Sequence, residues 1–156
     1  MKQATRLTIL IALVSILAVP SAGAAGPDKT QTLRFFAKEV SMTVTHADGS
    51  VDRKPPFGEP QAGDILDVNS LDYLGDHRHH AKRYGASHHL QCVFAEAEGA
   101  PDCVSHVAIG GSLLIFRGYP GTLINGTGRY QGATGRVLKN KEVKGGSDVV
   151  ARIHTR

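Results

Sequence analysis

Histidines are the side chains with the clearest capacity for chemistry, because five of the eight in this 156-residue chain lie between positions 77 and 89. Two imidazoles at i and i+2 of a strand share a face, so His77 and His79 could bind zinc or copper with a third ligand from His88 or His89. The alternative is a solvent-exposed loop whose histidines need no partner. No His-x-x-x-His on a helix and no Cys-x-x-Cys pair supports a structural metal. We expect no metal or cofactor and keep these four histidines only as weak metal candidates.

The two cysteines, Cys92 and Cys103, flank a segment at 96–101 that contains Gly, Pro and acidic residues, as turns do. The segments on either side, 90–95 and 104–109, have the composition of strands. A turn centred in the middle of the connecting segment places the two cysteines opposite each other on a hairpin. The pattern therefore predicts a disulfide, which would remove the Cys92 thiol as a nucleophile.

Glycines at 126, 128, 132 and 135 surround Tyr130 and follow a short apolar run that ends in Gly and Pro. A phosphate-binding loop would also begin with spaced glycines, but it needs a helix of about a dozen residues after it. The chain at 136–146 is too short and too soon interrupted by glycine. This density of glycine favours a corner between two strands. No Gly-x-Ser-x-Gly elbow marks a serine hydrolase.

Short apolar, β-branched and aromatic segments recur along the chain with turn residues between them, and no segment has a helical period. Such regular spacing predicts an antiparallel barrel or sandwich. The expected strands number about eight: 32–44, 64–74, a kinked strand over 81–95, 104–109, 113–117, 122–124, 134–139 and 147–154.

The run Gly-Ser-Leu-Leu-Ile-Phe-Arg-Gly at 111–118, followed by Ile-Asn-Gly-Thr-Gly-Arg-Tyr-Gln-Gly-Ala-Thr-Gly at 124–135, resembles the allene oxide cyclase and dirigent-like barrel superfamily. Segments at 63–73 and 83–93 fit the same template, so the resemblance covers about residues 31–140. It implies an all-β fold, an eight-stranded antiparallel β-barrel over 31–156 with a pocket at its mouth. An eight-stranded barrel can hold one small ligand.

The resemblance also implies pocket residues. A glutamate, an asparagine and a cysteine look into the pocket of allene oxide cyclases, and the nearest positions here are Glu39, Asn69 and Cys92. Glu39 and Asn69 are thus the catalytic candidates. The expected binding residues are Cys92, Tyr73, Phe94 and Phe116.

Two functions remain open at this point. The first is a barrel that steers the cyclisation or stereoselective coupling of a hydrophobic small molecule, acting as an isomerase or cyclase through positioning and exclusion of water. The second is a non-catalytic ligand carrier or structural barrel. A histidine-rich metal-binding protein ranks behind both.

The N-terminus has the three parts of a secretory signal peptide: Lys2 and Arg6, an apolar stretch at 7–19, and small residues at 20–25. We predict a signal peptide at 1–24, a disordered leader at 25–30 and a secreted, extracellular or periplasmic, barrel. The formal charge falls from +4 to about +2 once the two basic residues of the signal peptide are removed. No basic cluster indicates nucleic acid, and no membrane partner is expected after cleavage. Apolar residues on both faces of 113–116 allow a homo-oligomer, a dimer or a trimer.

Overall fold

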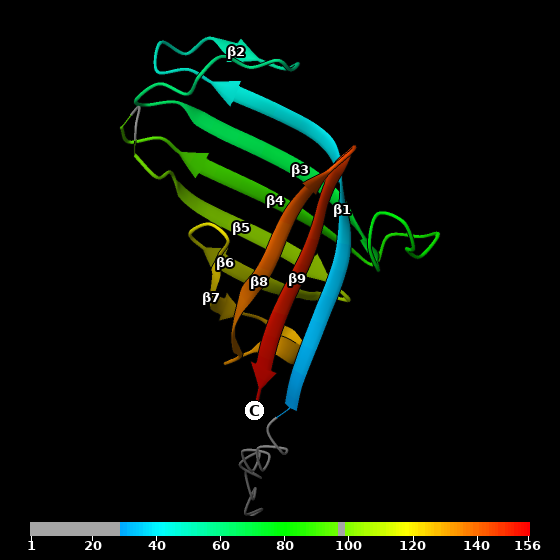
Figure 1. Ribbon diagram of the computed structural model, residues 1–156. Coiled ribbons are helices and arrows are strands. Elements are labelled where there is room, and N and C mark those ends of the chain that lie inside the picture. Colours follow the sequence, from blue (N-terminus) through cyan, green and yellow to red (C-terminus); the bar gives the residue numbers. More distant parts are fainter. Residues whose placement is uncertain (1–28, 97–98) are drawn as a thin grey trace, which may run out of the picture.

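One antiparallel sheet contains all the strands of the described residues, and its two long terminal strands pair with each other to close it. The computed structural model describes residues 29–96 and 99–156 (Figure 1). Eight strands make the barrel and the two-residue β2 adds to its edge, so the expected all-β, eight-stranded barrel is confirmed. The elements are β1 Lys29–Thr45, β2 Val51–Asp52, β3 Ile65–Leu74, β4 Ala86–Val93, β5 Asp102–Ile109, β6 Ser112–Arg117, β7 Thr122–Gly126, the 3₁₀ turn η1 Gly128–Tyr130, β8 Thr134–Val143 and β9 Gly146–Thr155.

Strand β1 closes the barrel because it is long enough to pair on both sides. Its first part pairs with β9 as far as Lys38, which lies opposite Gly146, and its second part pairs with β3 as far as Thr45. The two pairings overlap over 35–38, and a β-bulge between Glu39 and Ser41 follows the last pair with β9. Bulges bend a strand and increase its twist. Beyond the bulge β1 therefore leaves β9, and the barrel widens at that end (Figure 1).

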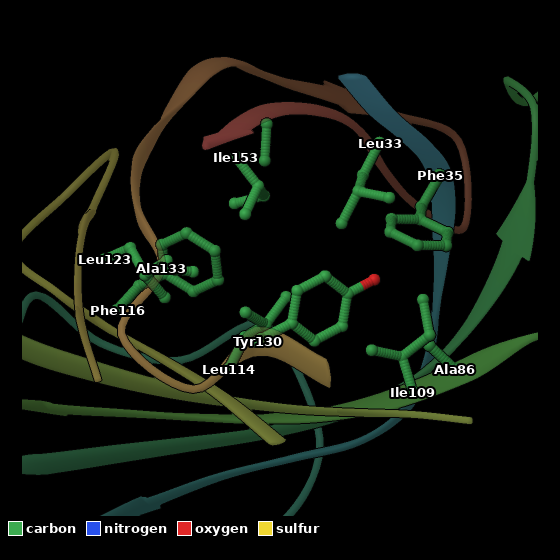
Figure 2. Packing of buried hydrophobic residues seen from close by; sticks show 11 residues of the cluster. Leu33, Phe35, Ala86, Ile109, Leu114, Phe116, Leu123, Tyr130, Ala133 and Ile153 are labelled. Carbon is green, nitrogen blue, oxygen red and sulfur yellow. The ribbon is translucent and has the colours of Figure 1, made fainter. Parts of the chain in front are cut away.

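The opposite end of the barrel is packed solid around Tyr130, which is 1% exposed. The glycine corner makes this possible: Gly128 has φ +57°, and a Cβ on it would collide with Ser112 Oγ. Figure 2 shows the Tyr130 ring lying among the aliphatic and aromatic side chains of the surrounding strands. The predicted corner between two strands is thus confirmed, and it forms the floor of the barrel. The floor residues are Leu33, Phe35, Ala86, Ile109, Leu114, Phe116, Leu123, Tyr130, Ala133, Ala151 and Ile153.

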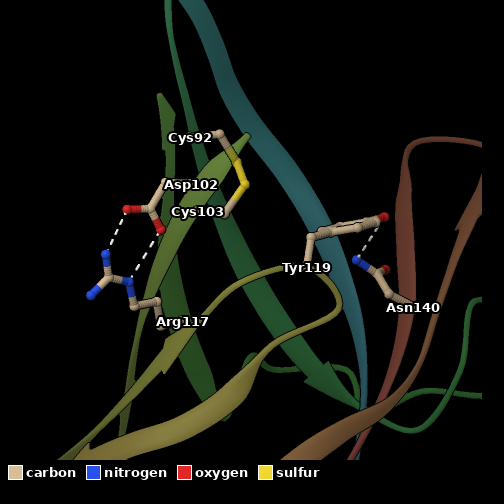
Figure 3. The surroundings of a disulfide bond; sticks show 6 residues. All are labelled: Cys92, Asp102, Cys103, Arg117, Tyr119 and Asn140. Carbon is tan, nitrogen blue, oxygen red and sulfur yellow. Dashed lines mark hydrogen bonds and ion pairs between the residues drawn. A yellow bond between two sulfur atoms is a disulfide. The ribbon is translucent and has the colours of Figure 1, made fainter. Parts of the chain in front are cut away.

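Cys92 and Cys103 are directly opposite on β4 and β5 and form the predicted disulfide. An exposed ion pair lies one residue along β5, where Arg117 Nη2 is 2.7 Å from Asp102 Oδ2 (Figure 3). This guanidinium lowers the pKa of the Asp102 carboxyl. Together the disulfide and the ion pair tie β4, β5 and β6 at the wide end of the barrel.

The structure differs from the sequence-based prediction at two places. The expected leader at 25–30 overlaps β1, which begins at Lys29 because the backbone there pairs with Thr155. The expected strand over 81–95 begins only at Ala86, since 75–85 is an irregular loop with one isolated bridge from Gly75 to His80. The predicted signal peptide at 1–24 lies outside the described residues. No helix in the described part of the chain has the length and apolar character needed to cross a bilayer.

Candidate functional site

The cavity of the barrel has two adjacent chambers. The upper chamber, at the wide end, has a volume of about 750 Å³. The lower chamber lies above the floor, has a volume of about 80 Å³ and is lined mainly by apolar side chains. The two are adjacent and have five lining side chains in common: His88, Leu90, Tyr119, Asn140 and Val149.

A buried acid and base pair lies where the chambers meet. His88 Nδ1 is 2.9 Å from Asp72 Oδ1, and the two side chains are only 15% and 4% exposed. Asp72 on β3 lies opposite Ala86, two residues before His88 on β4, so the pair is a diagonal contact on the inner face. Asp72 also lies opposite Ala37 on β1. The small alanine on each side leaves the carboxylate room to reach the imidazole.

This arrangement fixes which ring nitrogen of His88 can act on a ligand. A carboxylate only accepts hydrogen bonds, so the Nδ1 that faces Asp72 is the nitrogen that donates. Nε2 is then the acceptor, and no hydrogen bond to it is formed by residues 29–96 or 99–156. An imidazole held in this way can accept a proton from a bound molecule or return one to it.

Two β-bulges bring polar side chains into the upper chamber. The bulge in β1 lets both Glu39 and Met42 face inward, and a bulge in β8 between Val137 and Lys139 lets both Val137 and Asn140 do so. Without the extra residue, the alternation of a strand would direct one member of each pair outward. Bulges next to a cavity often redirect a side chain toward a ligand.

Asn140 lies on the wall across from the disulfide (Figure 3). Its Nδ2 donates to Tyr119 Oη at 3.3 Å. Its Oδ1 is buried and has no hydrogen-bond partner within the described chain. Buried acceptors without a partner are rare in folded proteins, and a ligand donor is one way to satisfy them.

Four of the predicted site residues line the cavity. Glu39, Cys92 and Phe94 lie around the upper chamber and Phe116 around the lower one. Cys92 does so as half of the disulfide, and among the described residues there is no free cysteine.

The other two, Asn69 and Tyr73, lie on the outer face. Asn69 Nδ2 donates to Ser41 Oγ, and the Tyr73 ring packs 6.5 Å from Phe36 and 5.1 Å from His80, measured between ring centroids. Ser70 and Asp72 point inward, so their odd-numbered neighbours must point outward. Neither residue touches the cavity.

The predicted metal candidates are dispersed by the fold. His77 Nδ1 lies 2.6 Å from Asp148 Oδ2, His79 is exposed, and His89 Nε2 lies 2.9 Å from Asp67 Oδ1 on the outer face. The first two are in a loop and not on a strand, so the assumed shared face does not exist. In the part of the chain that the structure describes, no three His, Cys, Asp or Glu residues gather around a point where a metal could bind.

Sequence reasoning missed Asp72 altogether and considered His88 only as a metal ligand. The signal was present in the alternation of β3, where residues 66, 68, 70 and 72 share a face that is apolar at one end and polar at the other. Reading it would have required the register between β3 and β4, which pairs Asp72 with Ala86.

The β1–β3 loop is anchored at the mouth by His46. Its two ring nitrogens lie 3.2 Å from Asp64 Oδ2 and 3.3 Å from Asp52 Oδ2. The hydrogen bonds to these two carboxylates raise the pKa of His46, that to Asp52 contributing most. The backbone N–H of Gln61, which donates to Asp64, lowers the pKa of Asp64. Backbone hydrogen bonds between Phe94 and the end of this loop hold it beside the upper chamber.

Comparison with solved structures identifies the architecture. A structure of the pterocarpan synthase dirigent protein GePTS1 matches with a TM-score of 0.59 and 15% sequence identity, over 92% of this chain and 99% of that one. The chain has a dirigent-like barrel fold. No protein-family model matches the sequence, and no curated protein is significantly similar to it. At this identity the dirigent-like barrel is shared as a fold, and the function must be argued from the cavity.

Proposed function

We propose that this dirigent-like barrel binds an amphiphilic small molecule in its cavity and steers its ring closure or coupling. The observation that carries the proposal is the buried Asp72–His88 pair between a wide chamber and an apolar one. Concave, largely apolar sites with a few converging polar groups are the usual form of small-molecule sites. The similar solved protein is named a pterocarpan synthase, so synthesis of a small organic molecule is compatible with this fold.

The chemistry that suits the pair is addition of a hydroxyl group to an electron-poor carbon of the same molecule. His88 Nε2 takes the hydroxyl proton as the new C–O bond forms, and the Asp72 carboxylate stabilises the resulting imidazolium. The proton then goes to the atom of the substrate that received the displaced electron pair. The product is an isomer of the substrate, so the step needs no oxidant or cofactor. The apolar wall restricts which face of the carbon is attacked.

A non-catalytic carrier is the second candidate, and the width of the upper chamber favours it. A volume of about 750 Å³ is ample for a drug-sized molecule to enter and leave without a change in the barrel. In that case the ligand would be released unchanged. The export of the protein in either function remains a proposal; the disulfide supports it, since such bonds persist in oxidising compartments.

Binding is tested by filling the cavity. Val149 lines both chambers, whereas the next residue, Val150, lies opposite Lys139 on the outer side and lines neither. We expect Val149→Trp to weaken binding of Nile red by about tenfold or more, a loss of about 1.4 kcal/mol. Val150→Trp is the matched control and should bind the dye as the wild type does. Equal binding by all three proteins would overturn the proposal.

Steering is tested with 2′-hydroxychalcone, whose phenol adds to its own enone and gives racemic flavanone in water. We expect an enantiomeric excess in the presence of the wild type and racemic product with His88→Gln. Chiral chromatography measures the ratio, and fluorescence titration measures binding of the chalcone. Tight binding with racemic product at the uncatalysed rate would favour the carrier over the steering barrel.

A further inference from the structure

The charges that face the cavity are of one sign. Among the described residues that line its two chambers, the charged side chains are the acids Glu39, Asp72 and Glu142, with no lysine or arginine. Asp72 accepts a hydrogen bond from His88 Nδ1. Glu39 and Glu142 form no ion pair and no side-chain hydrogen bond with any residue of 29–96 or 99–156. The charged side chains that line the upper chamber are therefore two exposed carboxylates without an ion-pair partner in the described part of the chain.

Two basic residues on the strands near the mouth face away from it, whereas Lys144 is exposed in the turn between Val143 and Gly145, which both line the upper chamber. Lys38 precedes Glu39 and Lys141 precedes Glu142, so strand alternation directs both lysines to the outer surface, where both are exposed. A charge on the far side of a strand acts through solvent, which screens it over about 8 Å at physiological ionic strength. A ligand in the chamber thus meets the carboxylates first.

The uncharged polar groups point to the same ligand chemistry. Asn140 Oδ1 is a buried acceptor in the wall of both chambers and has no partner within the described chain. His88 offers Nε2 as an acceptor for the reason given above. A ligand that brings a hydrogen-bond donor satisfies His88 Nε2, whereas one that brings only acceptors leaves it unpaired.

The lower chamber indicates the chemistry of the other end of the ligand. It is bounded mainly by apolar side chains, with Asp72 and His88 at its junction with the upper chamber, and its volume of about 80 Å³ takes one end of an alkyl chain or the edge of a ring. Its apolar walls favour the burial of apolar atoms of the ligand. Its apolar lining includes Leu33, Phe35, Leu114, Phe116, Val137 and Ala151.

We propose that the ligand of this cavity is an organic amine: a protonated amino group held in the upper chamber near Glu39, Glu142 and Asn140, on an apolar or aromatic body directed into the lower chamber. The inference rests on the proposed small-molecule function and names its substrate class. Carboxylate ligands such as fatty acids are disfavoured, because their charge would face two uncompensated carboxylates.

The test is displacement of Nile red by three compounds with one skeleton, 3-phenylpropan-1-amine, 3-phenylpropan-1-ol and 3-phenylpropanoate, at pH 7. We expect the amine to bind about fivefold more tightly than the alcohol, and the carboxylate to be the weakest, since exposed charge pairs contribute only modestly to affinity. The preference should shrink in 0.5 M NaCl.

Variants locate the effect. The double change Glu39→Gln and Glu142→Gln should bring the amine and the alcohol to equal affinity. Glu59→Gln removes the same charge from an exposed loop residue that lines neither chamber and should leave the preference intact. Melting curves verify that all three proteins are folded.

Each outcome decides a different claim. If Nile red binds and the carboxylate competes as well as the amine, the amine inference is overturned while the cavity function stands. An amine preference that survives in the double variant overturns the assignment to Glu39 and Glu142. If the wild type does not bind Nile red, or if Val149→Trp binds it as tightly as the wild type does, the proposed function itself fails. The inference then falls with it.

Discussion

His88 and Asp72 meet inside the barrel with 2.9 Å between Nδ1 and Oδ1, while the adjacent His89 meets Asp67 at the same distance outside it. Two neighbouring histidines on one strand therefore each contact an aspartate, but one pair lies inside the barrel and the other on its outer surface. The inner pair is 15% and 4% exposed and the outer pair 41% and 26%. Burial decides what each pair contributes, because an unpaired buried carboxylate is costly and an exposed one is not.

Replacing the two histidines in turn should separate these effects. His88→Phe leaves Asp72 buried without its partner, so we expect the free energy of unfolding to fall by about 1–3 kcal/mol. His89→Phe breaks only the exposed pair and should change it by less than about 0.5 kcal/mol. Urea unfolding followed by circular dichroism measures both.

The double variant Asp72→Leu and His88→Phe should recover part of the loss, since it removes both polar partners at once. Equal destabilisation by His88→Phe and His89→Phe would contradict the argument. It would mean that the carboxylate of Asp72 is solvated through the cavity.

The sequence predicted the strands and the hairpin register well because both depend on local patterns. The turn at 96–101 and the strands beside it suffice to place Cys92 opposite Cys103. The cavity residues depend on features with no local signal. Bulges in β1 and β8 shift the inward set by one residue, which brings in Asn140, and the pairing of β3 with β4 sets Asp72 beside His88. The family resemblance aligns these positions only to within one or two residues. It could therefore not distinguish Asn69 from its inward-facing neighbour Ser70.

The disulfide should stabilise the wide end of the barrel. Cys92→Ser with Cys103→Ser should lower the free energy of unfolding by about 2–3 kcal/mol, the value typical of a short closed loop. Guanidinium unfolding with and without dithiothreitol provides the measurement. The reduced wild type should match the variant. Insensitivity of the wild type to dithiothreitol together with a stable variant would argue that the bond adds nothing.

The mouth loop should be sensitive to pH through His46. The folded protein raises the pKa of His46 above its ordinary value of 6.5, so this stabilisation is fully present below about pH 6.5 and is lost as the pH rises through the raised pKa. The difference in Tm between the wild type and His46→Gln should therefore be larger at pH 5.5 than at pH 8.5.

His154→Gln is a suitable control, because this exposed histidine contacts Thr30 and no carboxylate. Its Tm difference from the wild type should not vary over the same range. At the acid end, the lowered pKa of Asp64 means that its contribution is present above pH 3.8 and is lost as the pH falls through that lowered value. A Tm difference for His46→Gln that grows toward pH 8.5 would reverse the assigned sign.

Tyr130 presents a hydroxyl that the floor of the barrel does not use. The side chain is 1% exposed and its Oη has no hydrogen-bond partner within the described residues. Removing an unpaired buried hydroxyl relieves its desolvation cost, so Tyr130→Phe should raise the free energy of unfolding by about 1 kcal/mol. Tyr130→Ala removes the ring as well and should lower it by about 3–5 kcal/mol. Chemical denaturation measures both changes. If Tyr130→Phe were instead destabilising by more than about 1 kcal/mol, the hydroxyl would have a partner such as a buried water, and the floor would be a polar site and not merely a packed one.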